Sequence, residues 1–163
     1  MKNKVIAVVG ALALLLAYKF FTADSPEGII KDRLEQFRVA ALEPIGLVGL
    51  NRLTRVKGLE RYFMKDLKVI ARNGKFVLNG RSDLSRLAQA GYSRAPKVDL
   101  SFKDLSLEFL DDETVNLHLT VLVEGKELDS RWEQAQEFVI IMKKDSGDWL
   151  FARIELIEAL SLE

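Results

Sequence analysis

The residues able to perform acid–base or metal chemistry are few in this 163-residue chain. His118 is the only histidine and there is no cysteine. Disulfides, thiolate metal sites and cysteine nucleophiles are therefore excluded, and a zinc site would need mostly carboxylates. We expect His118 on the strand face opposite Leu117 and Leu119, where it would meet solvent or a second copy of the chain. The sequence predicts no catalytic residue, no metal and no cofactor.

The strongest candidates for binding a ligand are four residues: Tyr62, Trp132, Arg153 and Glu155. Arg153 and Glu155 share the two-residue alternation of Trp149 and Phe151 in the C-terminal stretch. Charged residues in phase with aromatic ones indicate a polar spot in an apolar wall, which is typical of ligand sites. The competing interpretation is that Arg153 and Glu155 form an exposed pair beyond the end of that wall.

A catalytic base in this chain would have to be a carboxylate. The candidates on or near predicted strands are Asp66, Glu133, Glu137 and Glu155. Their spacing does not single out one of them, and carboxylates on strands are usually solvated.

The charge balance argues against nucleic acid as a partner. The chain has 24 basic and 24 acidic residues, mixed along its length, so no phosphate-neutralising surface is indicated. One group of cations lies in the second predicted helix, and we interpret it as a solvated helix face: Arg52, Arg55, Lys57, Arg61 and Lys65.

The N-terminal segment predicts a membrane anchor. Lys2 and Lys4 precede an apolar run that extends over residues 5–23 if Lys19 reaches the interface, close to the ~20 residues that a spanning helix needs. The N-terminus would stay cytoplasmic and the remainder would be extracytoplasmic, which is periplasmic in a Gram-negative cell. The alternative is a secreted protein with a cleaved signal. Residues 1–25 are thus anchor and linker, and residues 26–163 form one domain.

The pattern after the anchor indicates helices followed by strands. Ser25 and Pro26 start a helix, and a second helical pattern runs over residues 47–63, with a possible break at Gly58. Asn73–Gly74 turns a hairpin between residues 67–72 and 75–78. A short helix with Leu84, Leu87 and Ala88 on one face comes next. Four long strands end the chain, the first with a bulge at Lys103–Asp104: 98–109, 115–123, 128–143 and 149–157.

This order of elements resembles the nuclear transport factor 2-like superfamily, which includes ketosteroid isomerase, scytalone dehydratase and polyketide cyclases. The matching pieces are the two helices, the hairpin at residues 67–78, the Gly80–Arg81 helix start, the bulged strand and the 147–151 entry to the last strand. The resemblance implies an α+β cone in which three helices pack on a curved, mostly antiparallel sheet of about six strands. It also implies a hydrophobic pocket, often with a homodimer through the sheet face, but no particular activity.

Two functions are compatible with these patterns. The first is a membrane-tethered, extracytoplasmic interaction or ligand-binding module without catalysis. The second is an enzyme or carrier of the ketosteroid-isomerase type that acts on a hydrophobic ligand in the cone. An enzyme should have a cavity with a buried carboxylate or histidine of shifted pKa, whereas an interaction module should have a cone filled by Phe76, Phe102 and Phe138.

Overall fold

The computed structural model describes residues 25–71, 74, 76–92, 97–127 and 130–160. The chain divides into two compact units, residues 1–36 and residues 37–163. The predicted membrane segment, residues 5–23, lies outside the described residues. Within the part of the chain that is described, no helix is both long enough and apolar enough to span a bilayer.

Helix α2 (Pro26–Leu42) starts in the first unit and continues into the second. Its start is as predicted, because the Gly28 N–H donates to Ser25 Oγ at 3.0 Å and Pro26 occupies the first helical position. Ser25 therefore satisfies an N–H group that the helix itself leaves without a partner.

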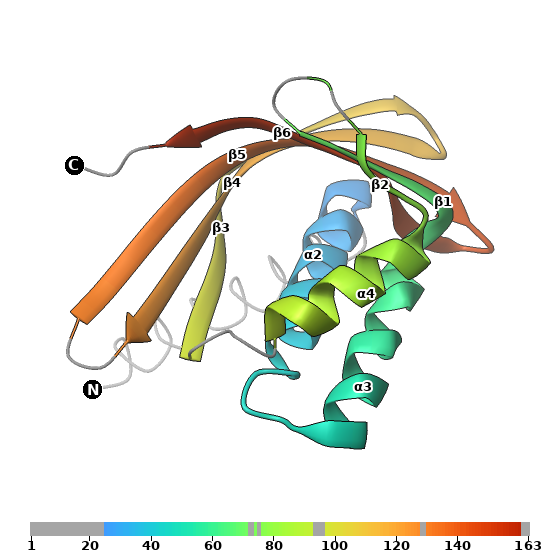
Figure 1. Ribbon diagram of the computed structural model, residues 1–163. Coiled ribbons are helices and arrows are strands. Elements are labelled where there is room, and N and C mark those ends of the chain that lie inside the picture. The colour runs from blue at the N-terminus through green and yellow to red at the C-terminus, as the bar shows by residue number, and fades with distance from the viewer. Residues whose placement is uncertain (1–24, 72–73, 75, 93–96, 128–129, 161–163) are drawn as a thin grey trace, which may run out of the picture. The chain divides into compact units, whose positions relative to one another are not determined.

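The second unit contains the sheet and the remaining helices. Its elements, in chain order, are α3 (Gly49–Gly58), the 3₁₀-helix η1 (Leu59–Tyr62), β1 (Phe63–Ile70), β2 (Phe76–Asn79), α4 (Arg81–Tyr92), β3 (Lys97–Asp111), β4 (Thr114–Glu127), β5 (Ser130–Asp145) and β6 (Asp148–Leu160). The strand order is β2-β1-β6-β5-β4-β3, and only β1 and β6 pair in parallel. The predicted α+β class, with three helices and a mostly antiparallel sheet of six strands, is confirmed. Figure 1 shows the sheet curving over α3 and α4.

The second predicted helix is shorter than expected. The prediction continued the helical pattern to Phe63 and marked Gly58 as a possible break. Helix α3 does end at Gly58, η1 follows, and Phe63 begins β1. The buried residues Leu59, Tyr62 and Phe63 explain the difference. A continuous α-helix would place adjacent Tyr62 and Phe63 about 100° apart around its axis, whereas the change from helix to strand lets both rings enter the core.

Four rings join the separate elements of the second unit. The Phe37 ring, in α2, lies edge-on against Tyr62 and Phe63, both with ring centres at 5.5 Å, and against Phe151 of β6 at 5.0 Å. These are favourable edge-to-face geometries. The cluster ties α2 to η1, β1 and β6 at the parallel junction of the sheet.

Bulges bend the long strands and change which face a residue occupies. The predicted bulge in β3 is confirmed: the register with β4 shifts between Lys103 and Ser106, and Asp104 has a φ of 52°. Two bulges in β6 were not predicted. Phe151 pairs with Met142 and Arg153 with Ile141, which leaves Ala152 as the extra residue, and a second shift leaves Ile157 extra. Each bulge reverses the alternation beyond it.

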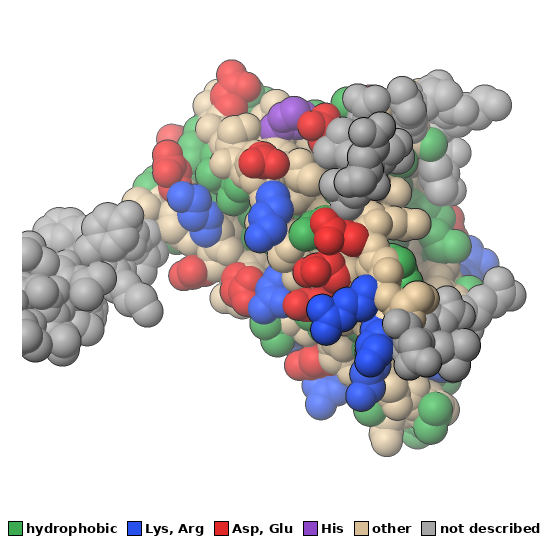
Figure 2. Space-filling view, turned by 90° about the vertical axis from the view of Figure 1, so that its left-hand side faces the viewer, with side chains coloured by type: hydrophobic (Ala, Val, Ile, Leu, Met, Phe, Trp, Pro, Cys, Tyr) green, Lys and Arg blue, Asp and Glu red, His purple; other side chains and the backbone are tan. Residues whose placement is uncertain are grey.

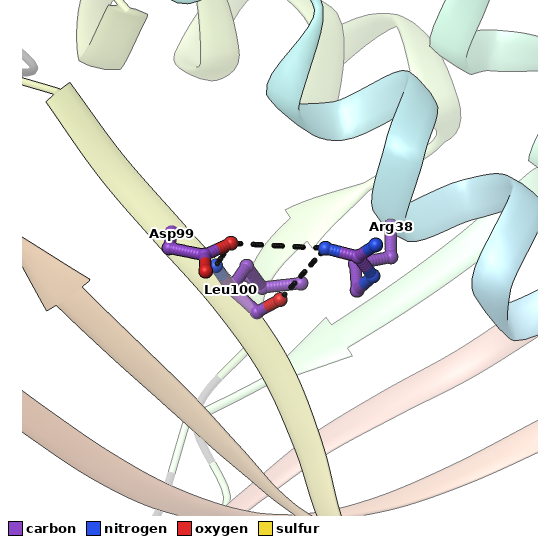
Figure 3. Close-up of polar contacts among 3 residues, drawn as sticks. All are labelled: Arg38, Asp99 and Leu100. Atoms are coloured by element: carbon purple, nitrogen blue, oxygen red, sulfur yellow. Dashed lines mark hydrogen bonds and ion pairs between the residues drawn. The ribbon is translucent and has the colours of Figure 1, made fainter.

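One edge strand of the sheet, β3, is held by a side chain from α2. Arg38 Nη1 donates to the Leu100 carbonyl oxygen at 3.3 Å and lies 3.7 Å from Asp99 Oδ1 (Figure 3). The ion pair contributes little because Asp99 is mostly exposed. The bond to the carbonyl occupies an edge group that could otherwise pair with another strand.

Gly125 in β4 and Trp132 in β5 are directly paired across the strands, and the indole lies on the glycine. A Cβ atom at position 125 would lie 2.2 Å from Trp132 Cζ2. No carbon approaches another so closely without movement of one of them. Glycine is therefore required here for space and not for backbone freedom, since Gly125 has no positive φ.

Gly125→Ala should lower the free energy of unfolding by about 1–3 kcal/mol, because the added methyl group must displace the indole. Gly91→Ala is the matched control, since no heavy atom lies within 4 Å of a Cβ there and alanine favours the helix. Urea unfolding measures both. If Gly125→Ala were as stable as the parent chain, the steric explanation would be wrong. Adding Trp132→Leu should remove most of the decrease in unfolding free energy that Gly125→Ala causes.

Candidate functional site

A largely apolar cavity of about 210 Å³ lies within the second unit. Its wall comes from the end of α2, from α3, η1, β1, α4 and β6. The lining residues are Phe37, Ala41, Val56, Leu59, Phe63, Leu84, Ser85, Ala88, Tyr92 and Ile154.

Helix α4 supplies one side of the cavity with a single stripe of residues. Leu84, Ala88 and Tyr92 are spaced by four positions and so lie above one another on the same helix face. Leu87 was predicted on this face but is 55% exposed, and Ser85 takes its place in the wall. The four-residue spacing that ends at Tyr92 could have identified the stripe in the sequence.

Strand β6 supplies Ile154 because of its bulge at Ala152. Phe151 pairs with Met142, and Ile154 pairs with Ile140, so both face the core side of the sheet. Arg153 pairs with Ile141, which lies on the other face. The predicted shared alternation of Arg153 and Glu155 with Phe151 is therefore wrong: the extra residue turns the two charged residues away from the cavity.

Two hydroxyl groups provide the polar atoms of the wall. The Tyr92 hydroxyl donates to the Ala41 carbonyl oxygen, and burial raises the pKa of Tyr92 above its ordinary value. The Ser85 hydroxyl donates to Glu60 Oε1 at 2.8 Å, and Glu60 is also 3.9 Å from Arg81. Both protons are thus already donated to protein acceptors, while the hydroxyl oxygens can still accept a hydrogen bond.

The described wall contains no carboxylate and no imidazole. Such a surface can bind an apolar molecule by dispersion and desolvation, and orient it through one or two acceptor oxygens. An apolar cavity of about 150 Å³ accommodates benzene, so this volume suits a molecule of one or two rings. The titratable side chain of this wall is that of Tyr92, whose hydroxyl donates to the Ala41 carbonyl oxygen.

The four predicted ligand-binding residues do not line this cavity. Tyr62 is buried; its hydroxyl accepts a hydrogen bond from Arg61 at 3.0 Å, and that guanidinium lies 5.0 Å from the ring centre. Trp132 covers Gly125. Arg153 and Glu155 form an ion pair at 2.8 Å on the opposite sheet face. Their role in ligand binding stays a prediction.

The remaining predicted residues also lie away from the cavity. His118 is exposed on the face opposite Leu117 and Leu119, which are buried, so its expected orientation is confirmed. Of the four candidate bases, Asp66 and Glu133 are exposed. The homodimer expected through the outer sheet face stays a prediction.

The expected filling of the cone by phenylalanines is only partly described. Phe102 and Phe138 are half-buried, and the side chain of Phe76 lies outside the described residues. Neither Phe102 nor Phe138 belongs to the cavity wall.

On the face seen in Figure 2, acidic and basic side chains are interspersed.

Comparison with known proteins identifies the fold but no close relative. No protein-family model matches the sequence, and no curated protein matches it. Among solved structures, a scytalone dehydratase-like protein from Novosphingobium aromaticivorans is similar with a TM-score of 0.67 and 14% identity, over 87% of this chain and 89% of that one. The fold is nuclear transport factor 2-like.

Two further structures support this assignment. A nuclear transport factor 2-like protein of unknown function from Pseudomonas aeruginosa has a TM-score of 0.64 and 12% identity, over 82% of this chain and 99% of that one. LinA has a TM-score of 0.62 and 16% identity, over 85% and 88% of the two chains. At these identities the nuclear transport factor 2-like fold is shared and nothing is implied about activity.

Tyr92→Phe should lower the free energy of unfolding at pH 7 by about 1 kcal/mol, because the bond to Ala41 is lost. In the parent chain, stability should also fall as the pH rises above about 10. The raised pKa of Tyr92 means that the unfolded tyrosine loses its proton first, so folding becomes less favourable.

This fall above pH 10 should be smaller in Tyr92→Phe, while all other titrating groups stay the same. Urea unfolding of both chains at pH 7 and pH 10.5 measures the difference. Parallel pH profiles of the two chains would show that Tyr92 ionises as easily in the folded chain as in the unfolded one.

Proposed function

We propose that this chain is a membrane-tethered, extracytoplasmic module that binds a small hydrophobic molecule in its cone without transforming it. The observation that supports binding is the cavity wall, in which eight carbon-rich side chains accompany two hydroxyls that already donate to the protein. An apolar ligand would lose water from its surface on entry and would leave no polar group of the wall without a partner.

The same wall favours binding over catalysis. A cone enzyme of the ketosteroid-isomerase type needs a base within hydrogen-bonding reach of its substrate. Glu60 is a carboxylate that contacts a wall residue: it accepts a hydrogen bond from Ser85 and pairs with Arg81. Glu60 therefore orients Ser85, and Ser85 stands between it and the cavity.

A direct test uses 4-fluoroindole, a two-ring apolar probe, observed by fluorine NMR. We expect the full-length chain to bind it, and Ala88→Leu to weaken binding by at least about tenfold, because the larger side chain fills the cavity. Ala90→Leu is the matched control: the same substitution lies in the same helix, but Ala90 is exposed and is not in the wall.

Failure of the parent chain to bind the probe would argue against an accessible cavity. Equal binding by Ala88→Leu and Ala90→Leu would place the probe elsewhere. Because Ala88→Leu adds volume to the core, its thermal unfolding must be recorded alongside, so that loss of binding is distinguished from loss of folding.

The proposed tether consists of residues 5–23, preceded by Lys2 and Lys4. If it is an uncleaved anchor, the chain should stay in the membrane fraction after alkaline carbonate extraction and retain its original N-terminus. A single cysteine at the exposed position Leu110 should react with an impermeant maleimide from outside the cytoplasmic membrane. A mature protein that begins near residue 24 would instead indicate a cleaved signal.

A further inference from the structure

We propose that the exposed face of α3, together with Val48 before it, docks on a membrane containing anionic lipids. We call this surface the α3 tip and define it by Val48, Leu50, Arg52, Leu53 and Lys57. It lies apart from the ligand cavity, and the inference does not depend on what that cavity binds or on residues 5–23.

The α3 tip exposes large aliphatic side chains close together. Val48, Leu50 and Leu53 are 77%, 76% and 43% exposed. Single exposed leucines are common, but three within six residues form a patch. Gly46 and Gly49 have φ values of 79° and 58° and turn the chain on both sides of Val48, and no heavy atom lies within 4 Å of a Cβ at either glycine.

These side chains are not needed for packing within the fold. Helix α3 contributes Val56 to the core, and Leu59 follows it there. Leu50, Leu53 and Lys57 follow the spacing i, i+3 and i+7, which places them on one exposed face of α3, next to the row of the buried Val56. In Figure 1 helix α3 begins far from the sheet and runs toward it.

The charge around this patch matches an anionic surface. Residues 47–58 contain Arg52, Arg55 and Lys57 and no acidic residue. Glu43 pairs with Arg55 at 3.2 Å, so the net positive charge of the tip comes chiefly from Arg52 and Lys57. Apolar side chains beside basic ones are the composition with which helices bind the interface of anionic bilayers.

A groove beside the α3 tip contains both charged and neutral polar side chains, and its Arg55 is already paired with Glu43, another residue of the lining. It has a volume of about 510 Å³, and its lining includes Asn51, Thr54, Arg55 and Arg61. Guanidinium groups pair well with phosphate oxygens. A headgroup phosphate that approached Arg55 would have to compete with Glu43, so the proposal relies on Arg52 and Lys57 for attraction while Leu50 and Leu53 enter the acyl boundary.

Another exposed apolar pair shows why charge selects the α3 tip. Phe109 and Leu110 are also exposed, but Asp111, Asp112 and Glu113 follow them directly. Three carboxylates would be repelled by an anionic membrane. The β3–β4 turn is therefore excluded by the same argument and provides a matched reference position.

The test uses the full-length chain, which contains no cysteine and so can be labelled at one introduced thiol. Leu50→Cys and Leu110→Cys, each carrying an environment-sensitive NBD fluorophore, are combined with vesicles that contain doxyl-labelled lipid as quencher. The vesicles are phosphatidylcholine alone or phosphatidylcholine with phosphatidylglycerol at a ratio of about 3:1. We expect quenching at position 50 in the anionic vesicles, and much less in the neutral ones or at position 110.

Charge reversal tests the electrostatic part. In the Leu50→Cys background, Lys57→Glu should weaken docking by at least about fivefold, because each cation near an anionic surface contributes about that factor. Lys144→Glu makes the same change of charge at an exposed position in β5 and should leave the quenching unchanged. Circular dichroism and thermal unfolding of each labelled chain verify that it is folded.

Several results would overturn the proposal. One is that the label at position 50 stays unquenched with both kinds of vesicle. Another is that the labels at positions 50 and 110 are quenched equally, which is what attachment through the predicted anchor alone would give. Equal quenching in neutral and anionic vesicles would remove the role of the cations. Concentration-dependent shielding of the position 50 label without lipid would assign the α3 tip to contact between two copies of the chain.

Discussion

The curvature of the sheet depends on one constraint: an antiparallel strand cannot bend sharply and keep its alternation, so each bulge exchanges the two faces. In β6 the extra residue is Ala152. Phe151 before it and Ile154 after it both face the core side, while Arg153 and Glu155 turn outward and pair with each other. The apolar character of the cavity follows from this exchange, because without it two charges would point into the cone.

Helix α4 forms one side of the cavity through the regular spacing of its residues. Leu84, Ala88 and Tyr92 form one stripe of α4, and the small Ala88 between two larger side chains leaves unfilled volume. The polar atoms of the wall donate to protein acceptors, Ser85 to Glu60 and Tyr92 to the Ala41 carbonyl. The interior can therefore stay apolar without a buried donor lacking a partner.

Several of the charged and titratable side chains considered above lie away from the cavity. His118 and the Arg153–Glu155 pair occupy the outer sheet face, and the cations Arg52 and Lys57 belong to the same helix as the exposed Leu50. Both proposals rest on this separation. The largely apolar wall of the cavity supports the proposal of ligand binding, while the basic and apolar face of α3 supports the proposal of contact with a charged lipid surface.

Local patterns in the sequence determined the class of fold and most element boundaries. Ser25–Pro26 starts α2, Gly147 turns β5 into β6, and the phase change at Lys103–Asp104 marks a real bulge. These features depend on residues within a few positions of one another. The burial of the leucines at positions 117 and 119, and the exposure of His118, also follow from strand alternation alone.

The tertiary structure alone decided the site. Nothing near Ala152 in the sequence marks a bulge, since the extra residue is accommodated by pairing with β5 on one side and β1 on the other. The change from η1 to β1 at Phe63 likewise depends on the burial of Tyr62 and Phe63 against Phe37. Which residues face the cavity is set by contacts between segments far apart in the chain, and such contacts leave no periodic signal in the sequence.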